Sequence, residues 1–381
     1  MSEVLLQKVN GKRDLKRFIR FNAELYKDCP WAVPDFMEDT LETFSLKNNA
    51  AFEFCRAEWF LAYKDDRVVG RVVAFINERA NARWNRKSVR FGWIDFIDDE
   101  AVSRALLDAV ADWGREHGMT EMHGPLGFTD MDPEGMLIEG FDQLSTISTI
   151  YNYPYYPVHF EHYGMQKETD WVQRHIAMPS KGNAGWERYA RVASMASKRY
   201  GLSVHKFKSK KEIWEGGYDF KFFETINKSY ASLFGYSEMT DRQMRSYAER
   251  YLRFVDLRLL SIIENSKGEV VAAAACMPSL SRAMQKAKGR LFPWGWWHIL
   301  KALYIKRDET LDMLLIGVVP EYQDKGAVTL IFADLIPQIL KLGFKWGEIH
   351  PQLEDNTRGL GIWDVFENTI HKRRRAWKKM I

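Results

Sequence analysis

Hydrophobic and polar positions along the chain change period at several points, and the clearest change lies between residues 311 and 342. Residues 311–319 are an apolar run of strand length, rich in β-branched side chains. Pro320 ends this run because proline has no backbone N–H for a sheet ladder. After a polar loop, apolar residues recur at helical spacing from Ala327 to about Leu342. The pattern predicts a strand, a loop and a helix.

The start of this helix is a candidate anion site. The first backbone N–H groups of a helix have no intrahelical acceptor, and the helix dipole is positive at that end. Gly326 precedes the helix, and a residue without a bulky side chain lets a phosphate approach. Lys325 adds a cation. We therefore expect Lys325, Gly326, Ala327 and Val328 to bind a phosphate group.

The same order of elements occurs twice in the chain. In the first half the pattern predicts a helix, a hairpin, a strand, a helix and further strands; these are residues 14–26, 57–64, 67–76, 91–96, 101–117 and 122–126. The second half predicts the hairpin, the strand and helix described above, and closing strands; these are residues 257–263, 270–277, 311–319, 327–342, 347–353 and 370–379. We interpret this order as an internal duplication, with domains at 1–178 and 179–381.

The two predicted copies differ where the phosphate site would lie. In the first copy the loop before the main helix reads DDEA and contains no glycine. Bulkier, acidic residues keep a phosphate away from the helix amides, so we expect a degenerate first copy that binds no coenzyme. The second copy carries the site and an aromatic insertion at 280–310.

Composition argues against several classes of function. Hydrophobic residues make up 46% and charged residues 28%, as in globular proteins. A net charge of +4 over 381 residues argues against a nucleic-acid binder. The three cysteines lack metal-ligand spacing, so we expect reduced thiols and no metal. Neither a signal-peptide core nor a run of transmembrane length is present, which predicts a cytoplasmic protein, with peripheral contact at the inner membrane surface left open.

The strand-to-helix loop resembles the pyrophosphate-binding segment of the GCN5-related N-acyltransferases (GNATs). Gln323 and Gly326 match that pattern, and Val328 stands where it has glycine or alanine. Four longer sequence segments give a wider resemblance, over nearly the full length of the chain, to a bacterial family of double-domain acyltransferases. This family includes proteins similar to bacterial ceramide synthase. The segments are AEWFLAYKDDRVVGRVVAFIN, GPLGFTDMDPEGMLIEGFD, YNYPYYPVHFEHYGM and GVVPEYQDKGA. The resemblance implies two tandem GNAT-like folds of the α/β (α+β) class, with mixed central sheets flanked by helices.

The resemblance also implies the reaction and its site. GNAT enzymes transfer an acyl group from acyl-coenzyme A (acyl-CoA), a co-substrate, to an amine, and ceramide synthases use a sphingoid base as that amine. The thioester would lie where the strand ending near Val319 separates from the strand that begins near Gly347. Backbone N–H groups of Val318 or Val319 would then face the carbonyl oxygen. The pyrophosphate would lie between Gln323 and Val328.

Acyl transfer to an amine also needs a base that removes a proton from the ammonium group. The candidates are Glu348 and His350, two residues apart on one strand, and Asp312 on the preceding strand. A structural hydrogen-bonded pair is the alternative for Glu348 and His350. A cluster of tyrosines would protonate the thiolate, line the acceptor pocket or simply pack; its members are Tyr151, Tyr153, Tyr155 and Tyr156.

Two further segments suggest contacts beyond the reaction. Residues 290–307, RLFPWGWWHILKALYIKR, combine aromatic and aliphatic residues with basic ends. This composition is typical of a segment at a lipid interface, of a lid over an acyl tunnel, or of an insertion buried between the two copies. The basic C-terminal residues 371–380 would meet anionic headgroups or the coenzyme's 3′-phosphate, or form a charged edge strand that resists pairing.

Two functions of different classes follow from the sequence. The first is an acyl-CoA-dependent N-acyltransferase that acts on a small-molecule or lipid amine, with no nucleic acid as partner. The second is a non-catalytic protein that keeps the GNAT fold and binds a lipid or a partner protein. Calorimetry with acyl-CoA and the identity of co-purifying molecules distinguish the two.

Overall fold

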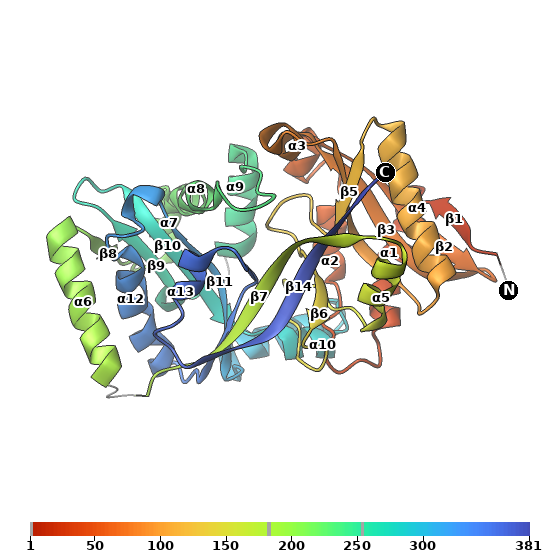
Figure 1. The fold of residues 1–381 in the computed structure, drawn as a ribbon. Coiled ribbons are helices and arrows are strands. Elements are labelled where there is room, and N and C mark those ends of the chain that lie inside the picture. Colours follow the sequence, from red (N-terminus) through yellow and green to blue (C-terminus); the bar gives the residue numbers. More distant parts are fainter. Residues whose placement is uncertain (1–2, 181–183, 253–254) are drawn as a thin grey trace. The chain divides into compact units, whose positions relative to one another are not determined.

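The computed structural model describes residues 3–180, 184–252 and 255–381. These residues form two compact units, and neither unit is a continuous stretch of chain. Unit 1 comprises Met1–Val172, Leu280–Lys306 and His371–Ile381, and unit 2 comprises Gln173–Ser279 and Arg307–Ile370. The chain therefore enters each unit more than once (Figure 1).

Unit 1 contains a mixed sheet flanked by helices. Its strands are β1 (Leu5–Lys8), β2 (Cys55–Lys64), β3 (Arg67–Asn77), β4 (Ser88–Phe96), β5 (Glu121–Gly124), β6 (Met136–Glu139), the first part of β7 (Gln166–Ala177) and the last part of β14 (Asn368–Met380). Its helices are α1 (Gly11–Leu25), α2 (Met37–Thr43), α3 (Glu78–Trp84), α4 (Glu100–Glu116), α5 (Tyr155–His162), α10 (Ser281–Ala287) and α11 (Gly295–Leu300), with short helical turns at Ala50–Glu53 and Lys301–Ile305. Strands β1 to β5 are neighbours in order, and β14 follows β5.

Local sequence explains the hairpin and the main helix of unit 1. Asp65 and Asp66 adopt φ values of 47° and 59°, as a two-residue turn between β2 and β3 requires. The Asp99 carboxylate accepts a hydrogen bond from the Ala101 N–H at 2.9 Å and caps α4. The predicted turn and helix are confirmed.

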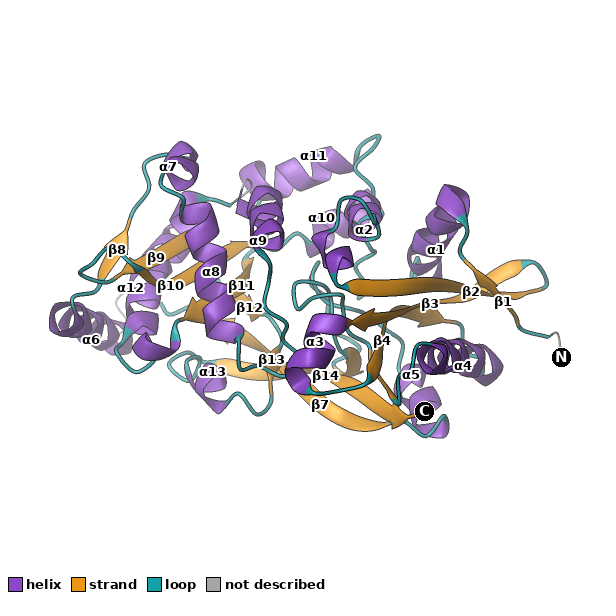
Figure 2. Ribbon diagram, turned by 90° about the horizontal axis from the view of Figure 1, so that it is seen from above, coloured by secondary structure: helices purple, strands orange, loops and turns teal. Residues whose placement is uncertain are grey.

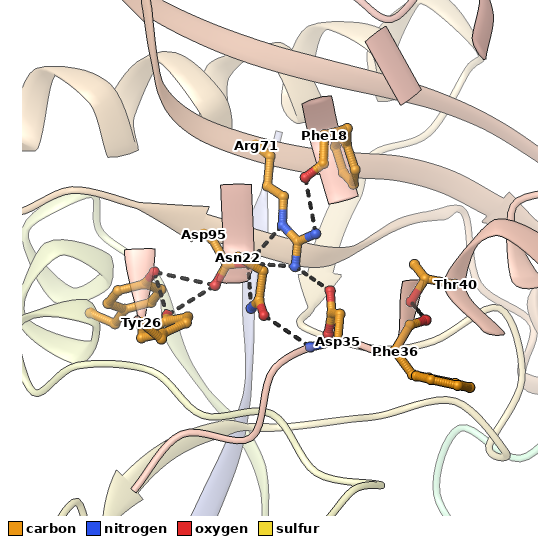
Figure 3. Close-up of polar contacts among 9 residues, drawn as sticks. Phe18, Asn22, Tyr26, Asp35, Phe36, Thr40, Arg71 and Asp95 are labelled. Carbon is orange, nitrogen blue, oxygen red and sulfur yellow. Dashed lines mark hydrogen bonds and ion pairs between the residues drawn. The ribbon is translucent and has the colours of Figure 1, made fainter. Parts of the chain in front are cut away.

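A buried cluster of charged and polar side chains fixes helix α1 and the segment that follows it (Figure 3). Arg71 on β3 contacts Asp95 at 2.6 Å and Asp35 at 2.7 Å, and its side chain is 1% exposed. Tyr26 and Asn22, both at the end of α1, donate hydrogen bonds to Asp95 at 2.9 and 3.1 Å. Each buried charge thus has an ionic or hydrogen-bonding partner within the cluster.

Unit 2 contains a second mixed sheet flanked by helices. Its strands, in spatial order, are the last part of β7, β12 (Trp346–Ile349), β11 (Thr310–Val318), β10 (Val270–Pro278), β9 (Leu260–Glu264) and β8 (Ser203–His205), and β13 (Gln352–Leu353) pairs with β7. Its helices are α6 (Ala184–Tyr200), α7 (Lys210–Glu215), α8 (Tyr218–Tyr230), α9 (Asp241–Tyr247), α12 (Ala327–Lys341) and α13 (Thr357–Gly361), with shorter turns at Ala248–Leu252, Leu257–Leu259 and Pro320–Tyr322.

Helices cover both faces of the sheet in unit 2. Gly317 on β11 faces α8, because a Cβ atom there would meet Ile226 at 2.8 Å and Ser229 at 3.1 Å. Val318 faces the opposite side, where it joins the apolar cluster of α12. Helix α6 packs along α12 (Figure 2). The start of α12 is therefore held between the sheet and α6.

Each sheet is completed by a strand segment from the other half of the chain. Ile176 and Ala177, in the first half, pair with Gly347 and Trp346 of β12 within unit 2. The last residues of β14 pair with β5 within unit 1, as Trp377 does with Gly124. The compact units thus differ from a linear division at residues 178 and 179, and the duplication stays a prediction.

The C-terminal strand is not an edge strand, so that expectation was wrong. Strand β14 pairs with both β5 and β6. Lys372 and Arg374 are buried, and their side chains donate to the backbone carbonyls of Leu144 and Ile150. Arg375 makes two hydrogen bonds to the carboxylate of Asp170, at 2.8 and 3.0 Å. The basic residues of the tail therefore serve pairing and charge neutralisation inside unit 1.

Candidate active site

The sheet of unit 2 opens between β11 and β12. The two strands run parallel and pair only from Thr310 opposite Trp346 to Met313 opposite Ile349. Strand β11 continues to Val318, whereas β12 ends at Ile349. The pairing of β10 with β11 also shifts register, since Ala275 pairs with Leu315 and Cys276 with Met313, which leaves Leu314 as a bulge. Bulges of this kind re-aim side chains and commonly lie beside active sites.

The edge of β11 at this opening presents backbone groups that β12 does not use. The Val319 N–H donates to the Val271 carbonyl at 3.0 Å, toward β10 and away from the opening. The backbone N–H and C=O groups of successive strand residues point to alternate neighbouring strands. The backbone groups of Val318 and Ile316 therefore point to the opening. The Val318 N–H donates to the Ser229 hydroxyl at 3.0 Å, and the Ile316 carbonyl accepts from the Tyr230 hydroxyl at 3.2 Å. Of the two predicted donors, Val319 is engaged in the ladder and Val318 in a bond to one rotatable hydroxyl.

The N-terminus of α12 lies directly after this edge. Gly326 precedes the helix with φ 76°, and no side chain caps it. The first hydrogen bond into the helix runs from the Leu330 N–H to the Gly326 carbonyl, at 3.2 Å. Among the described residues, no acceptor receives the N–H groups of Ala327, Val328 and Thr329. These amides are the donors that the sequence predicted for an anion.

The structure explains Gly326 by backbone conformation and helix packing rather than by the approach of a phosphate. A Cβ atom there would lie 2.6 Å from the Cβ atom of Ala196 on α6. Glycine is therefore required by its positive φ and by helix packing, whatever binds nearby. The side chain of Val328, which departs from the GNAT pattern, packs against the apolar cluster of unit 2.

Polar and basic side chains surround the loop before α12. Gln323 donates to the Val318 carbonyl at 3.3 Å and accepts from the guanidinium of Arg358 on α13. Arg358 also lies 3.5 Å from Asp324. The ammonium of Lys325 lies 4.4 Å from the ring centre of Tyr322. Two cations thus lie at this loop, Lys325 within it and Arg358 on α13, and sequence reasoning had found only Lys325.

Two of the three predicted base candidates lie side by side at the start of the opening. Asp312 on β11 is directly opposite Glu348 on β12, and Glu348 is opposite His175 on β7. Gln173, two residues before His175, donates to Glu348 at 3.3 Å. Because directly opposed residues point to one face of a sheet, Asp312, Glu348 and His175 form a row. Leu311 and Met313 belong to the apolar cluster of α12, so this row faces the α8 side.

His350 is placed differently from the prediction. Strand β12 ends at Ile349, so His350 lies beyond it, and the expected alternation of Glu348 and His350 along one strand was wrong. Pro351 follows and prevents continuation of the ladder. His175 instead supplies the imidazole beside Glu348, and its ring stacks on Trp346 with centroids 4.9 Å apart. Sequence reasoning missed it because β7 belongs to the first half of the chain.

Helix α8 contributes two residues that the sequence did not single out. Ser229 and Tyr230 end this helix and reach the backbone of β11 at Val318 and Ile316. Burial raises the pKa of Tyr230 to about 12, so its hydroxyl stays protonated at neutral pH. A polar pair at the end of an amphipathic helix is a weak signal, and only the register of β11 identifies it.

The start of α4 in unit 1 is capped by the protein's own side chain. Asp99 caps α4 through the Ala101 N–H, and the backbone carbonyl of Asp99 accepts from Val102 at 3.0 Å. A carboxylate at this helix start repels a second anion. In unit 1 the tyrosine hydroxyls bond to the protein, for example Tyr155 to the Phe96 carbonyl at 2.6 Å and Tyr151 to the Phe141 carbonyl at 3.1 Å. Of the three interpretations of the tyrosine cluster, these hydrogen bonds favour packing.

Comparison with solved structures decides the fold. A tandem GNAT protein from the clavulanic acid biosynthesis pathway matches 99% of this chain and 98% of its own length, with a TM-score of 0.54 at 11% identity. This chain has the tandem GNAT fold. A GCN5-related N-acetyltransferase from Sphaerobacter thermophilus matches 99% of the chain and 95% of its own length, with a TM-score of 0.50 at 12% identity. The predicted fold class is confirmed.

Two curated proteins are similar in sequence along nearly the whole of this chain. Protein YghO of Escherichia coli is 27% identical over 97% of this chain and 94% of its own length. The bacterial ceramide synthase of Caulobacter vibrioides is 26% identical over 98% of this chain and 96% of its own length. No family model matches the sequence.

Two features are absent from the described residues, 3–180, 184–252 and 255–381. In these residues no group of three or more His, Cys, Asp or Glu side chains is arranged to hold a metal ion. No helix within the same residues is both long and apolar enough to cross a membrane.

Proposed function

We propose that this protein is an acyl-CoA-dependent N-acyltransferase whose active site lies in unit 2. One observation carries the proposal: the sheet opens between β11 and β12 next to a helix start whose amides have no acceptor among the described residues. A coenzyme A molecule requires a groove for its extended pantetheine arm and an anion site for its diphosphate. Both requirements meet at this place, and the tandem GNAT fold supports the same assignment.

The diphosphate would bind at the N-terminus of α12. The N–H groups of Ala327, Val328 and Thr329 donate, and the helix dipole favours negative charge there. Lys325 and Arg358 supply the cations. Arg358 is held by Gln323 and Asp324 and is largely exposed, so it can turn toward a phosphate without leaving a buried charge behind.

The thioester would lie in the opening, along the edge of β11. The N–H groups of Ile316 and Val318 point to this edge and would stabilise the oxyanion of the tetrahedral intermediate. For Val318 this requires the Ser229 hydroxyl to turn away or to share the bond. Backbone donors are fixed before the substrate arrives, so little reorganisation accompanies the reaction.

The proton balance of the reaction requires an acceptor and a donor. The incoming ammonium loses one proton to a base, and its nitrogen attacks the thioester carbonyl. As the C–S bond breaks, the nitrogen loses its second proton, and the released thiolate takes up a proton. Glu348 is our candidate base, with Asp312 and His175 beside it and His350 just beyond the strand. Tyr230, whose hydroxyl is protonated and lies at the β11 edge, is the candidate acid.

A long-chain amine is the acceptor that we propose, with a sphingoid base as the first compound to test. Similarity to a bacterial ceramide synthase along nearly the full chain supports this choice over a peptide or amino acid acceptor. A cytoplasmic enzyme with this substrate would work at the inner surface of a membrane, because such amines partition into bilayers.

The proposal is tested with purified protein, radiolabelled palmitoyl-CoA and a panel of amines that includes a sphingoid base, a simple long-chain amine and a peptide. We expect labelled amide with a long-chain amine and none with the peptide. Absence of acyl-CoA binding by calorimetry would exclude the enzyme. Glu348→Gln serves as the matched variant, since it keeps the hydrogen-bonding shape and removes the base.

A non-catalytic binding function is the second candidate. The occupied Val318 and Val319 amides favour it, because a site without turnover needs no oxyanion donors. Mass spectrometry of the purified protein separates the two functions: a retained lipid with no turnover supports binding alone, whereas retained coenzyme A supports the enzyme.

A further inference from the structure

Residues 291–305 of unit 1, here called the aromatic segment, expose an unusual density of apolar side chains. Phe292 is 74% exposed and Trp294 71% exposed. Other large apolar residues of the segment are also exposed; they are Trp296, Trp297, Leu300, Tyr304 and Ile305. Soluble proteins rarely gather so many exposed rings in one short stretch, and such patches mark interaction sites. The rings of this segment are therefore not buried within unit 1.

The inner side of the aromatic segment is already packed. Gly295 is buried, and a Cβ atom there would lie 1.7 Å from the Arg290 carbonyl and 3.1 Å from the Cβ atom of Ala287. Leu303, two turns later, is buried as well. Helix α11 and the turn after it therefore use one face against α10 and leave a second apolar face outside. A helix that is apolar on all sides needs an apolar environment for the remaining face.

The base of the aromatic segment is fixed to the body of unit 1. Gln285 on α10 donates to the carbonyls of Pro30 and Ala32 at 2.9 and 2.8 Å, and the Met37 N–H donates to the Gly289 carbonyl at 2.9 Å. Asp35, in the same stretch, is one of the two carboxylates that neutralise Arg71 (Figure 3). The exposed rings thus extend from a base held by hydrogen bonds and by the buried charge cluster.

The charge around the aromatic segment favours an anionic partner. Residues 286–306 carry five basic side chains and no acidic one. The positive charge of this short stretch is thus larger than the net charge of the whole chain, which is +4. All five are exposed; they are Lys286, Lys288, Arg290, Lys301 and Lys306. Aromatic rings bracketed by cations suit the headgroup region of an anionic bilayer, where the rings enter the interface and the cations meet lipid phosphates. A second copy of the chain would bring an identical cationic surface, which repels.

We propose that the aromatic segment docks this protein on anionic membrane surfaces, with Phe292 and Trp294 inserted into the interface. The segment is 15 residues long and cannot span a bilayer, so the contact is peripheral. Docking of this kind requires no acyl donor and does not depend on the active site in unit 2.

Vesicle co-sedimentation tests the docking surface. Full-length protein is mixed with phosphatidylcholine vesicles with and without phosphatidylglycerol, at low and high salt. We expect binding to the anionic vesicles, weakened by salt because surface charges are screened. The Phe292→Ser/Trp294→Ser variant should bind about tenfold more weakly or worse. Its control, Leu46→Ser/Trp214→Ser, changes one exposed aliphatic and one exposed aromatic residue elsewhere and should bind like the wild type.

The basic residues around the aromatic segment are tested by the same vesicle co-sedimentation assay. Lys288→Gln/Lys301→Gln should lose about fivefold in affinity for each lysine. Lys12→Gln/Lys208→Gln removes two exposed lysines elsewhere and should change little. The proposal is overturned if neither vesicle binds, if neutral and anionic vesicles bind equally, or if the control variants lose as much as the test variants.

Two other roles for the segment give different results. A dimer interface would show a doubled mass by light scattering that returns to a monomer in Phe292→Ser/Trp294→Ser. A lid over an acyl tunnel would weaken palmitoyl-CoA binding in that variant. Either result without vesicle binding overturns membrane docking and leaves the proposed enzyme untouched, whereas a vesicle-binding protein without acyl-CoA affinity would reject the enzyme alone.

Discussion

Substitution of Gly326 by alanine tests the geometry that holds the N-terminus of α12. Two costs add at this position. An L-residue at φ 76° costs about 1–2 kcal/mol. The new Cβ atom also meets the Cβ atom of Ala196 at 2.6 Å, and neither atom can rotate away, so the two helices must separate; overpacking of this kind costs about 1–3 kcal/mol. We expect Gly326→Ala to lose about 2–5 kcal/mol in total.

Gly343, at the other end of α12, provides a matched control. Its φ is 85°, and a Cβ atom there would meet nothing within 4 Å. Gly343→Ala should therefore cost only the backbone term, about 1–2 kcal/mol. Ala196→Gly should restore about 1–3 kcal/mol to Gly326→Ala by removing the clash, although it costs about 1 kcal/mol alone because glycine weakens a helix.

Hydrogen exchange of the α12 amides, measured by mass spectrometry, gives these free energies locally, which matters in a chain of two units. If Gly326→Ala and Gly343→Ala open the helix equally, or if Ala196→Gly brings no rescue, the close approach of α6 and α12 is not as described. Coenzyme A affinity, measured on the same variants, then shows whether the position of the helix start matters for binding.

Three further substitutions probe the chemistry, the buried charge cluster around Arg71 and the buried histidine His123 of β5. Glu348→Gln should lower kcat about 10²-fold or more and leave the Kd for acyl-CoA unchanged, because a base acts only in the chemical step; an unaltered kcat would remove Glu348 from that role. Arg71→Met should destabilise unit 1 by about 3–5 kcal/mol, since it leaves Asp35 and Asp95 without their cation, whereas Arg56→Met, which breaks the exposed pair with Glu78, should cost at most about 1 kcal/mol; equal losses in urea unfolding would contradict the assignment. Burial lowers the pKa of His123 to about 4, despite its hydrogen bond to Glu168, so below the ordinary value of 6.5 the unfolded chain binds the proton more readily. The stability of unit 1 should therefore be retained above pH 6.5 and fall by up to about 3 kcal/mol as the pH drops to 4, and His123→Gln should flatten this slope in unfolding measured across that range.

The sequence predicted best what depends on neighbours along the chain. The Asp65–Asp66 turn, the Asp99 cap and helix α12 follow from local chemistry, and the structure has them. The pairing of β7 and β14 with strands from the other half could not be predicted, because no local pattern specifies a partner so distant in the chain. For the same reason the tail was interpreted as an edge strand, and His175 was missed.

In the candidate site, too, the sequence predicted the features that depend on local signals and not those that depend on distant contacts. The position of the anion site followed from the strand, the glycine and the helix start, all local signals. The orientation of single groups did not: the Val319 amide turns toward β10 because of the register of β11, and His350 leaves the strand because Pro351 follows. Ser229, Tyr230 and Arg358 reach the site through packing between elements, which periodicity does not encode.

Hydrogen exchange of the loop and first turn, residues 323–330, with and without coenzyme A is the most direct test of the central claim. We predict that the amides of Ala327, Val328 and Thr329 exchange markedly more slowly in the presence of coenzyme A, because they would donate to its diphosphate. Residues 98–103, at the capped helix start of unit 1, should not change. Slower exchange at residues 98–103 instead, or coenzyme A binding that leaves residues 323–330 unchanged, would contradict the claim.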